Sequence, residues 1–341
     1  MSSLRPGFRG TPLSLRRLLT SREFGVLIVL ALLCAAMYFT PVAGAFYSGR
    51  NLQNILRNLS LLAIFAIGET VVIITGGIDL SLGSLIAFSG MVTAFALVRL
   101  DTRLITSAAT VASIGIALAV ALLIGALHAT LIHRLRLPPF VVTLASLLVL
   151  RSQARVMNDQ LPIPLAQYSG LLYLANGNLF DNSRLPIPVP LVILAVVAIV
   201  AGVLLGRTQM GRYVYSVGSN ETATALSGVN VYRVKLFAYG MSGLLGGLAG
   251  VLWASYGGQG DPLAAQGYEL DAVAAAVVGG ASLSGGQGSV FGTVLGATLL
   301  YVIFSAINLS LSKPDLWRGT VVGGVLLFAV LVSALQQRRA S

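Results

Sequence analysis

The stretch 71-VVIITGGIDLSLGSLIAF-88 joins two long apolar runs through a short segment that is rich in glycine and serine. Spanning the hydrocarbon core of a bilayer takes about 20 apolar residues. The runs on either side of 75-TGGIDLSLGS-84 supply them at about 53–74 and 80–100. The stretch therefore predicts two membrane-spanning helices with a break between them, and it places Asp79 at that break in a chain that otherwise avoids charge.

The composition of the whole chain is that of a membrane protein. Of its 341 residues, 56% are hydrophobic and 10% are charged, and the mean hydropathy is +0.87, whereas soluble domains carry about 25% charged residues. The single cysteine, Cys34, lies in an apolar run, which excludes a disulfide framework, and two histidines are too few for a metal cluster. We expect an all-α, polytopic integral membrane protein with glycine-broken segments and no metal site.

Ten apolar runs are candidate spans. Their approximate limits are 24–40, 53–74, 80–100, 107–133, 138–157, 189–208, 236–258, 268–282, 287–309 and 317–336. The eighth run is short and contains glycine, so nine spans plus a re-entrant segment also fit. The first run follows five arginines, as in a signal peptide, but it exceeds the usual 7–15 apolar residues of such a peptide. We interpret it as an uncleaved span.

The positive charges predict the orientation. Cytoplasmic loops carry an excess of Lys and Arg. Thirteen of the 22 basic residues fall in segments that are cytoplasmic if the N-terminus is inside, and seven fall outside. This predicts cytoplasmic termini, with a basic segment at 1–23, one transmembrane domain at 24–336 and a tail at 337–341. The net charge of +11 then reflects topology, and nucleic acid is not an expected partner.

Two loops between the predicted spans are long. The outer loop, at about 158–188, contains four prolines and has little helical periodicity, whereas the inner loop, at about 207–235, is polar. Within the inner loop, Asn220 is a good N-cap, and Gly228 suits the position after a helix where φ turns positive. We predict a two-turn helix between them on the cytoplasmic face. It either closes the loop or docks a cytoplasmic partner.

The break at Gly76 and Gly77 has two compatible interpretations. Each glycine weakens a helix by about 1 kcal/mol relative to alanine, and Asp79 lies where it could cap the following helix. Alternatively, the break exposes helix ends to a polar pathway, as in the discontinuous helices of transporters. We take Gly76, Gly77, Asp79 and Ser81 as pathway candidates.

A second glycine pair repeats the GGxxLS pattern of the first. Gly279, Gly280, Ser282 and Ser284 occupy the matching positions and are candidates for the same role. The repeat fits an old duplication, but six positions are also compatible with chance. Ser282 stands where the first copy has Asp79, so a paired-carboxylate chemistry is not supported.

Other polar residues within the predicted spans are sparse. Glu69 and Arg151 are candidate intramembrane charges, and ionisable groups at membrane depth are functional candidates by default. Glu269 and Asp271 open the eighth segment, where acidic residues suit a helix N-terminus. We interpret His128 as a packed residue because its surroundings are apolar.

Three separated motifs resemble one known family. The pattern E-x-A-x-A-L-S-G-V-N-V that follows G-R-Y-V-Y-S-V-G resembles the coupling loop of sugar-transporting ABC permeases, the membrane subunits of ribose, arabinose, xylose and galactofuranose importers. The stretches 75-TGGIDLSLGS-84 and 269-ELDAVAAAVVGGASLSGGQGSVFGT-293 resemble that family too. The resemblance covers about residues 50 to 335. Branched-chain amino acid permeases are relatives, but the motif GGIDLS at 76–81 resembles the sugar permeases more closely.

The resemblance implies a permease that moves a monosaccharide across the bacterial inner membrane by alternating access. It implies a separate cytoplasmic ATPase that holds ATP and Mg, a periplasmic sugar-binding protein, and a second permease copy or a sister permease in the lipid bilayer. It also implies that Asn220, Glu221, Ala225 and Gly228 couple the chain to the ATPase.

The chain itself is predicted to be neither an enzyme nor a cofactor-binding protein, because it has no G-x-x-x-x-G-K-[ST] phosphate loop. The alternative is an ion-coupled secondary transporter in which Glu69, Asp79 and Arg151 form a relay. The sequence does not identify the sugar.

Overall fold

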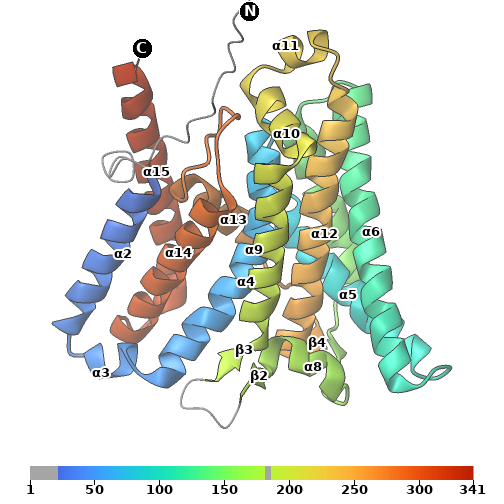
Figure 1. Cartoon of the computed structure of the whole chain (residues 1–341). Coiled ribbons are helices and arrows are strands. Elements are labelled where there is room, and N and C mark those ends of the chain that lie inside the picture. Colours follow the sequence, from blue (N-terminus) through green and yellow to red (C-terminus); the bar gives the residue numbers. More distant parts are fainter. Residues whose placement is uncertain (1–21, 181–185, 341) are drawn as a thin grey trace, which may run out of the picture.

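The computed structural model describes residues 22–180 and 186–340, and these form a bundle of helices that run between two ends (Figure 1). The helices are α2 (Arg22–Tyr38), α3 (Ala43–Phe46), α4 (Gly49–Ile74), α5 (Leu82–Leu100), α6 (Thr106–Arg134), α7 (Pro139–Val156), α8 (Ser169–Asn176), α9 (Val189–Arg207), α10 (Gln209–Ser219), α11 (Glu221–Leu226), α12 (Val231–Gly257), α13 (Tyr268–Val278), α14 (Val290–Ser310) and α15 (Pro314–Ala340). Among the described residues, seven helices are long and apolar enough to cross a membrane, namely α4 to α7, α9, α12 and α14.

The two ends of the bundle differ in what covers them. The short helices α10 and α11 lie at one end, which we call the α11 end, and α8 lies at the other, the α8 end (Figure 1). Helix α2 begins and α15 finishes at the α11 end, so the described chain enters and leaves the bundle on one side. Most of the predicted basic segment at 1–23 lies outside the described residues.

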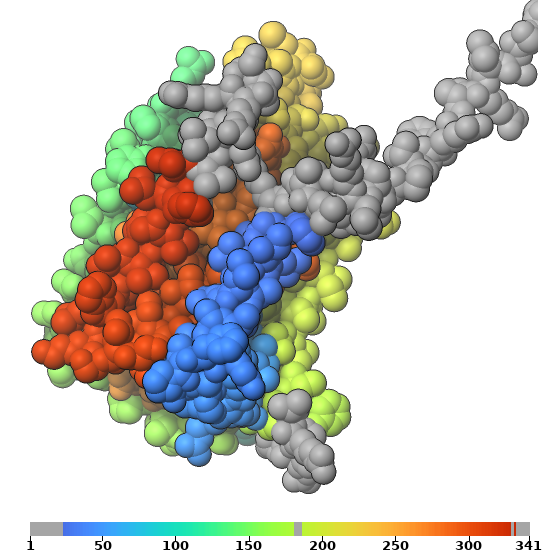
Figure 2. Space-filling view, turned by 90° about the vertical axis from the view of Figure 1, so that its left-hand side faces the viewer, coloured from blue at the N-terminus to red at the C-terminus, as the bar shows by residue number. Residues whose placement is uncertain are grey.

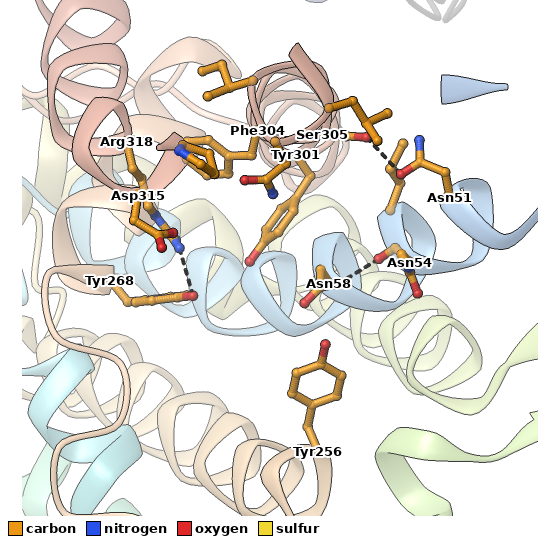
Figure 3. Close-up of a pocket in the computed structure, with 15 residues that line it drawn as sticks. Asn51, Asn54, Asn58, Tyr256, Tyr268, Tyr301, Phe304, Ser305, Asp315 and Arg318 are labelled. Carbon is orange, nitrogen blue, oxygen red and sulfur yellow. Dashed lines mark hydrogen bonds between the residues drawn. The ribbon is translucent and has the colours of Figure 1, made fainter. Parts of the chain in front are cut away.

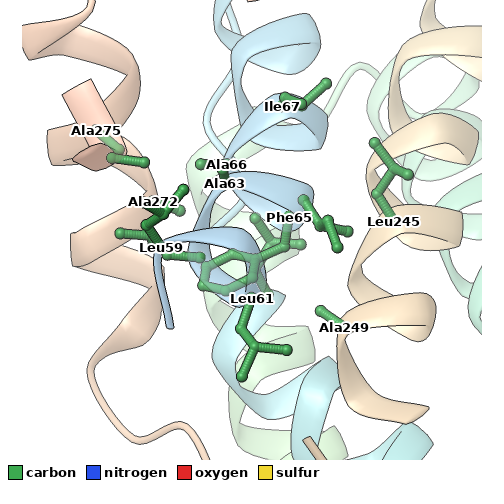
Figure 4. Close-up of a cluster of buried hydrophobic side chains, with 14 of the residues drawn as sticks. Leu59, Leu61, Ala63, Phe65, Ala66, Ile67, Leu245, Ala249, Ala272 and Ala275 are labelled. Carbon is green, nitrogen blue, oxygen red and sulfur yellow. The ribbon is translucent and has the colours of Figure 1, made fainter. Parts of the chain in front are cut away.

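Helix α4 is the centre of the bundle. Every residue from Leu59 to Ile74 is buried, as expected for a mostly apolar helix segment in the centre of a large protein. Figure 4 shows Phe65 and its neighbours between α12, which supplies Leu245 and Ala249, and α13, which supplies Ala272 and Ala275. On another side, α14 contacts α4 and also α2 and α15, and these outer helices form one face of the molecule in Figure 2.

Small residues bring α12 and α6 into close contact. A Cβ atom added to Gly125 of α6 would collide with the carbonyl oxygen of Tyr239 in α12, and one added to Gly243 of α12 would collide with the carbonyl oxygen of Ala121. Without a hydrophobic driving force between helices in lipid, such close backbone packing is a main source of their association. The α6–α12 contact therefore depends on the absence of side chains at these glycines.

Helix α13 is too short to cross the bilayer. Its 11 residues extend about 16 Å at 1.5 Å per residue, roughly half of a 30 Å hydrocarbon core. Before it, the chain from Gly258 to Gly267 is not helical, and β4 (Gln259–Gly260) pairs antiparallel with β1 (Ile163–Pro164). The predicted span at 268–282 thus ends at Val278, in agreement with the re-entrant alternative.

The outer loop has more structure than its sequence suggested. It contains α8 and the antiparallel pair β2 (Asn178–Leu179) and β3 (Ile187–Pro188). The hydroxyl of Ser255 in α12 donates to the carbonyl of Leu171 and accepts from the amide of Ala175, at 2.7 and 3.0 Å. These tertiary hydrogen bonds hold α8 on the end of α12, and a reading of local periodicity alone overlooks them.

The contact between α6 and α12 gives a prediction that compares two glycines of one helix. Gly125→Ala should destabilise the protein by about 1–3 kcal/mol, the usual cost of overpacking, because the new methyl group meets the α12 backbone. Gly115→Ala, where a Cβ atom meets nothing within 4 Å, should be neutral or stabilising by about 0.5–1 kcal/mol.

Thermal unfolding of the two purified variants in detergent, followed by tryptophan fluorescence, would measure both effects. Equal melting temperatures for the two variants would contradict the close packing of α6 on α12.

Candidate functional site

Helix α11 has the local geometry that the sequence predicts. The Oδ1 atom of the N-cap residue Asn220 accepts a hydrogen bond from the amide of Ala223 at 2.8 Å. At the other end, Gly228 has φ of +85°, and the Gly228 amide donates to the carbonyl of Ala225 at 3.0 Å. Both helix ends are thus closed within the chain, which leaves the sides of α11 free for contacts.

The surface of α11 is exposed and includes one large apolar side chain. Glu221 and Ala225 are exposed, and Leu226 is 85% exposed. Leu226 was not among the candidate residues from the sequence, although it is the one large apolar residue of the helix. Lys235 of α12 forms an ion pair with Glu221 at 2.8 Å, but Glu221 is half exposed, so the pair adds little stability.

Helix α10 precedes α11 and was not predicted. Its N-cap, Thr208, accepts from the amide of Gly211 at 3.1 Å. A Cβ atom added to Gly218 would collide with the carbonyl oxygen of Ile74 at the end of α4, and the hydroxyl of Tyr215 donates to the carbonyl of Gly288 at 2.9 Å. Helix α10 therefore attaches α11 to the end of α4 and to the loop before α14.

The predicted break between α4 and α5 is present. Helix α4 ends at Ile74, Gly76 has φ of +80°, and the amide of Gly77 donates to the carbonyl of Val72 at 3.2 Å. Helix α5 begins only at Leu82. The chain between the two helices is therefore a short non-helical segment whose polar groups need partners inside the bundle.

Asp79 supplies these partners. Its Oδ1 accepts from the amide and hydroxyl of Ser81, at 3.1 and 2.6 Å, and its Oδ2 accepts from the hydroxyl of Ser242 in α12 at 2.8 Å. The amide of Asp79 donates to the Glu69 carboxylate, at 3.1 Å to Oε1. The N-cap of α5 is Ser81 and not Asp79 as expected, because the helix starts two residues later. Asp79 joins α4, α5 and α12 at one point.

A second group of polar residues, which includes the buried residues His128 and Tyr239, lies next to this network. The Nε2 atom of His128 in α6 and the hydroxyl of Ser146 in α7 are 2.7 Å apart, and the His128 ring packs edge-on against Tyr239. The hydroxyl of Tyr239 is buried without a hydrogen-bond partner in the described chain and contacts Gly77. Tyr239 also lines a cavity of about 890 Å³ that separates α11 from the α4–α5 break.

Helices α4 and α13 end in the same way at the two glycine breaks. The equivalent backbone positions, however, are shifted by one residue relative to the GGxxLS pattern. Helix α13 ends at Val278, Gly280 has φ of +99°, and the amide of Ala281 donates to the carbonyl of Ala276 at 2.9 Å. By conformation Gly280 therefore matches Gly76, whereas the sequence pattern matches Gly279 to it. Ser282 and Ser284 belong to the loop that follows and take no part in the Asp79 network.

The two candidate intramembrane charges lie apart from each other. Arg151 of α7 donates to the backbone carbonyls of Pro262 and Ala264, at 3.2 and 2.6 Å, and so holds the non-helical segment before α13. Glu69 is bound to Asp79 at the α4–α5 break.

Glu269, in the first turn of α13 as predicted, occupies the space where a Cβ atom of Gly83 would be. The first turns of α5 and α13 therefore meet.

A polar cavity of about 470 Å³ opens at the α8 end between α4, α14 and α15 (Figure 3). Asn51, Asn54 and Asn58 line it from one face of α4, and Tyr301 lines it from α14. None of these residues was a candidate, although the asparagines in 51-NLQNILRN-58 are three and four residues apart, the spacing of one helix face.

Comparison with known proteins gives the family. Residues 51–331 match the family described as branched-chain amino acid transport system / permease component. The ribose import permease protein of Escherichia coli (strain K12) is 36% identical over 313 residues, which cover 91% of this chain and 93% of that protein. The xylose transport system permease protein of Haemophilus influenzae is 32% identical over an aligned length of 379 residues, gaps included. The alignment covers 94% of this chain and 99% of that protein.

A third relative, the ribose import permease protein of Bacillus subtilis, is 35% identical over 297 residues, which cover 84% of this chain and 86% of that protein. No solved structure matches the chain. The family match covers most of the chain and includes the α4–α5 break, the α10–α11 segment and the cavity at the α8 end. The chain therefore belongs to the branched-chain amino acid transport system permease component family, as a multi-pass membrane permease that is not itself a catalytic subunit.

Proposed function

We propose that this chain is the membrane-spanning subunit of an ATP-driven importer of a monosaccharide in the bacterial inner membrane. The observation that carries the proposal is an exposed helix, α11, closed at both ends and carrying Leu226 outward, in a chain 36% identical to a ribose import permease. We also propose a single permease domain at 24–336. It would contain about ten transmembrane helices, or nine with a re-entrant segment. The basic residues predict cytoplasmic termini, and α2 begins and α15 ends at the α11 end (Figure 1), so we propose that the α11 end faces the cytoplasm.

The partners follow from this assignment. A cytoplasmic ATPase, which holds ATP and Mg, docks on α11 through Leu226 and the exposed side chains of Glu221 and Ala225. A periplasmic sugar-binding protein delivers the sugar to the α8 end. The resemblance to sugar-transporting ABC permeases also implies a second copy of the chain or a sister permease in the complex. The names of the relatives, ribose and xylose permeases, favour a pentose over an amino acid.

Helix α12 is the element that connects the docking helix to the break. It begins five residues after α11 ends, and it carries Tyr239 against Gly77 and Ser242 on Asp79. A movement of α11 that shifts or rotates α12 therefore acts directly on the segment between α4 and α5. We propose that this contact converts ATPase closure into a change of access within the bundle, so that Gly76, Gly77, Asp79 and Ser81 act in switching.

The ion-coupled alternative assigned Glu69, Asp79 and Arg151 to one relay. In the structure Arg151 binds the carbonyls of Pro262 and Ala264, whereas Glu69 and Asp79 form a separate network. This separation supports the ATP-driven proposal.

The proposal is tested by uptake in cells without pentose transporters of their own that express the chain with its ATPase and binding protein. These cells should accumulate radiolabelled D-ribose or D-xylose. Accumulation should persist when a protonophore dissipates the proton gradient at constant ATP, and it should stop when ATP is depleted. The reverse pattern would overturn the ATP-driven proposal in favour of ion coupling.

Leu226→Asp should uncouple the permease from its ATPase. An apolar anchor at the centre of an interface contributes about 2 kcal/mol or more, so we expect at least a tenfold loss of bound ATPase. Since Leu226 is 85% exposed, the variant should fold normally. The measurement is the amount of ATPase that co-purifies with the tagged permease after gentle extraction.

Leu226→Met, which keeps the side chain apolar and of similar volume, is the matched control and should retain the ATPase. If Leu226→Asp co-purifies with as much ATPase as the control does, α11 does not dock the partner through this residue.

Asp79→Leu should abolish uptake, and Asp79→Asn should retain most of it. Leucine leaves the Ser81 amide and the Ser242 hydroxyl unpaired, each at a cost of about 1–3 kcal/mol. Asparagine still accepts from Ser81 through Oδ1 and donates to Ser242, whose hydroxyl also accepts. Uptake of D-ribose at matched membrane levels of the two variants measures the difference. An equal and complete loss in both would mean that the negative charge itself is required.

A further inference from the structure

The cavity at the α8 end is built from groups that suit a neutral polyhydroxylated ligand. It has a volume of about 470 Å³, within the range of about 300–1,000 Å³ that is usual for small-molecule sites. Asn51, Asn54 and Asn58 form a row of amides on one side, and the aromatic rings of Tyr268, Tyr301 and Phe304 lie across from them (Figure 3).

The amide row keeps free hydrogen-bonding capacity. Asn51 is used by the fold, since its Oδ1 accepts from Ser305 at 3.0 Å and its Nδ2 donates to the Phe46 carbonyl at 2.8 Å. The Asn58 Nδ2 donates to the Asn54 carbonyl at 2.8 Å. This leaves the Oδ1 of Asn58 and the whole side-chain amide of Asn54 without a partner in the described chain. Together they offer two acceptors and two donors, the combination that sugar hydroxyls require.

The charges of the cavity offer no partner for the carboxylate of an amino acid or of an organic acid. Arg318 is the one cation among the described residues that line it. Its guanidinium is already paired with Asp271 of α13, donates to the hydroxyl of Tyr268 at 3.0 Å and lies 4.7 Å from the ring centre of Phe304. A ligand carboxylate would find no free cation here and would meet the carboxylate of Asp315, which also lines the cavity.

We propose that this cavity is a sugar-binding site within the permease, the first one that a monosaccharide meets after its release at the α8 end. Asn54, Asn58 and Asp315 hydrogen-bond the hydroxyl groups, and Tyr301 packs against the apolar C–H face of the ring. This inference rests on the proposed import of a sugar and adds the residues that select it over an amino acid.

The site is also connected to the α4–α5 break through α13. Tyr268, which lines the cavity, is the first residue of α13, and the next residue, Glu269, contacts α5 at Gly83. Gly83 lies four residues after Asp79. A sugar that displaces Tyr268 therefore acts on the α4–α5 break through one turn of α13.

The test uses the complete transporter in proteoliposomes, with the binding protein outside and ATP inside. Asn54→Leu and Asn58→Leu should each lower D-ribose taken up per ATP hydrolysed by about three- to tenfold, the value of one hydrogen bond. Hydrolysis of ATP itself should persist. Gln53→Leu is the matched control, because Gln53 is adjacent on α4 but does not line the cavity, and its uptake per ATP should equal that of the unaltered protein.

Thiol labelling gives a second measurement that does not depend on transport. In a Cys34→Ser background, which removes the single cysteine, Asn58→Cys should react with a maleimide more slowly in the presence of D-ribose, and L-leucine should have no such effect. Gln53→Cys should react at the same rate with and without sugar.

The outcomes separate the two proposals. If the unaltered transporter takes up D-ribose or D-xylose but the asparagine variants match Gln53→Leu, or ribose does not slow labelling, the cavity is not the sugar site and the import proposal stands. If the unaltered transporter takes up L-leucine and neither pentose, both proposals are overturned.

Discussion

A helix that breaks inside a membrane protein must find partners for its free backbone groups among its neighbours, because the surrounding lipid offers none. At the α4–α5 break these partners are the carboxylates of Asp79 and Glu69. Asp79 binds Ser81 of its own segment and Ser242 of α12, while Glu69 of α4 binds the Asp79 amide. Asp79 is only 1% exposed, so three helices are fixed relative to one another at one buried point. Helix α5 starts from that point, and its first turn meets α13 at Glu269.

The features that the sequence predicts well are those set by neighbouring residues. The cap at Asn220, the positive φ at Gly228 and the break after Gly76 all follow from interactions within one helical turn, and each is present. The hydrophobic runs likewise place most helices within a few residues of their ends. Partners that are distant in the chain are not encoded in this way. Nothing local in α7 indicates that Arg151 binds Pro262 and Ala264, 111 and 113 residues later.

The same distinction explains the errors. Asp79 satisfies every local rule for an N-cap, yet the bond to Ser242 of α12 holds it two residues before the cap. The two GGxxLS copies are equivalent in sequence, but a helix ending is defined by the residue with positive φ. That residue is the first glycine, Gly76, in the first copy and the second glycine, Gly280, in the second copy. Asn54 and Asn58 carry a periodic signal that is visible in the sequence. Only the packing of α14 and α15 shows that this face lines a cavity.

Helix α13 and the loop that follows it connect the cavity at the α8 end to α10 at the α11 end. The first residue of α13, Tyr268, lines the cavity. After its last residue comes the loop in which the Gly286 amide donates to the carbonyl of Ile74 at 2.8 Å and the Gly288 carbonyl accepts from Tyr215 of α10. Helix α10 leads directly into α11, so under the proposed function a movement of α11 would be passed to the cavity through α10, this loop and α13. The 11 residues of α13 lie between Gly267 and Gly280, whose φ angles are +80° and +99°, so the chain turns sharply on both sides of a short rigid helix. A continuous helix across the bundle would have to move as a whole.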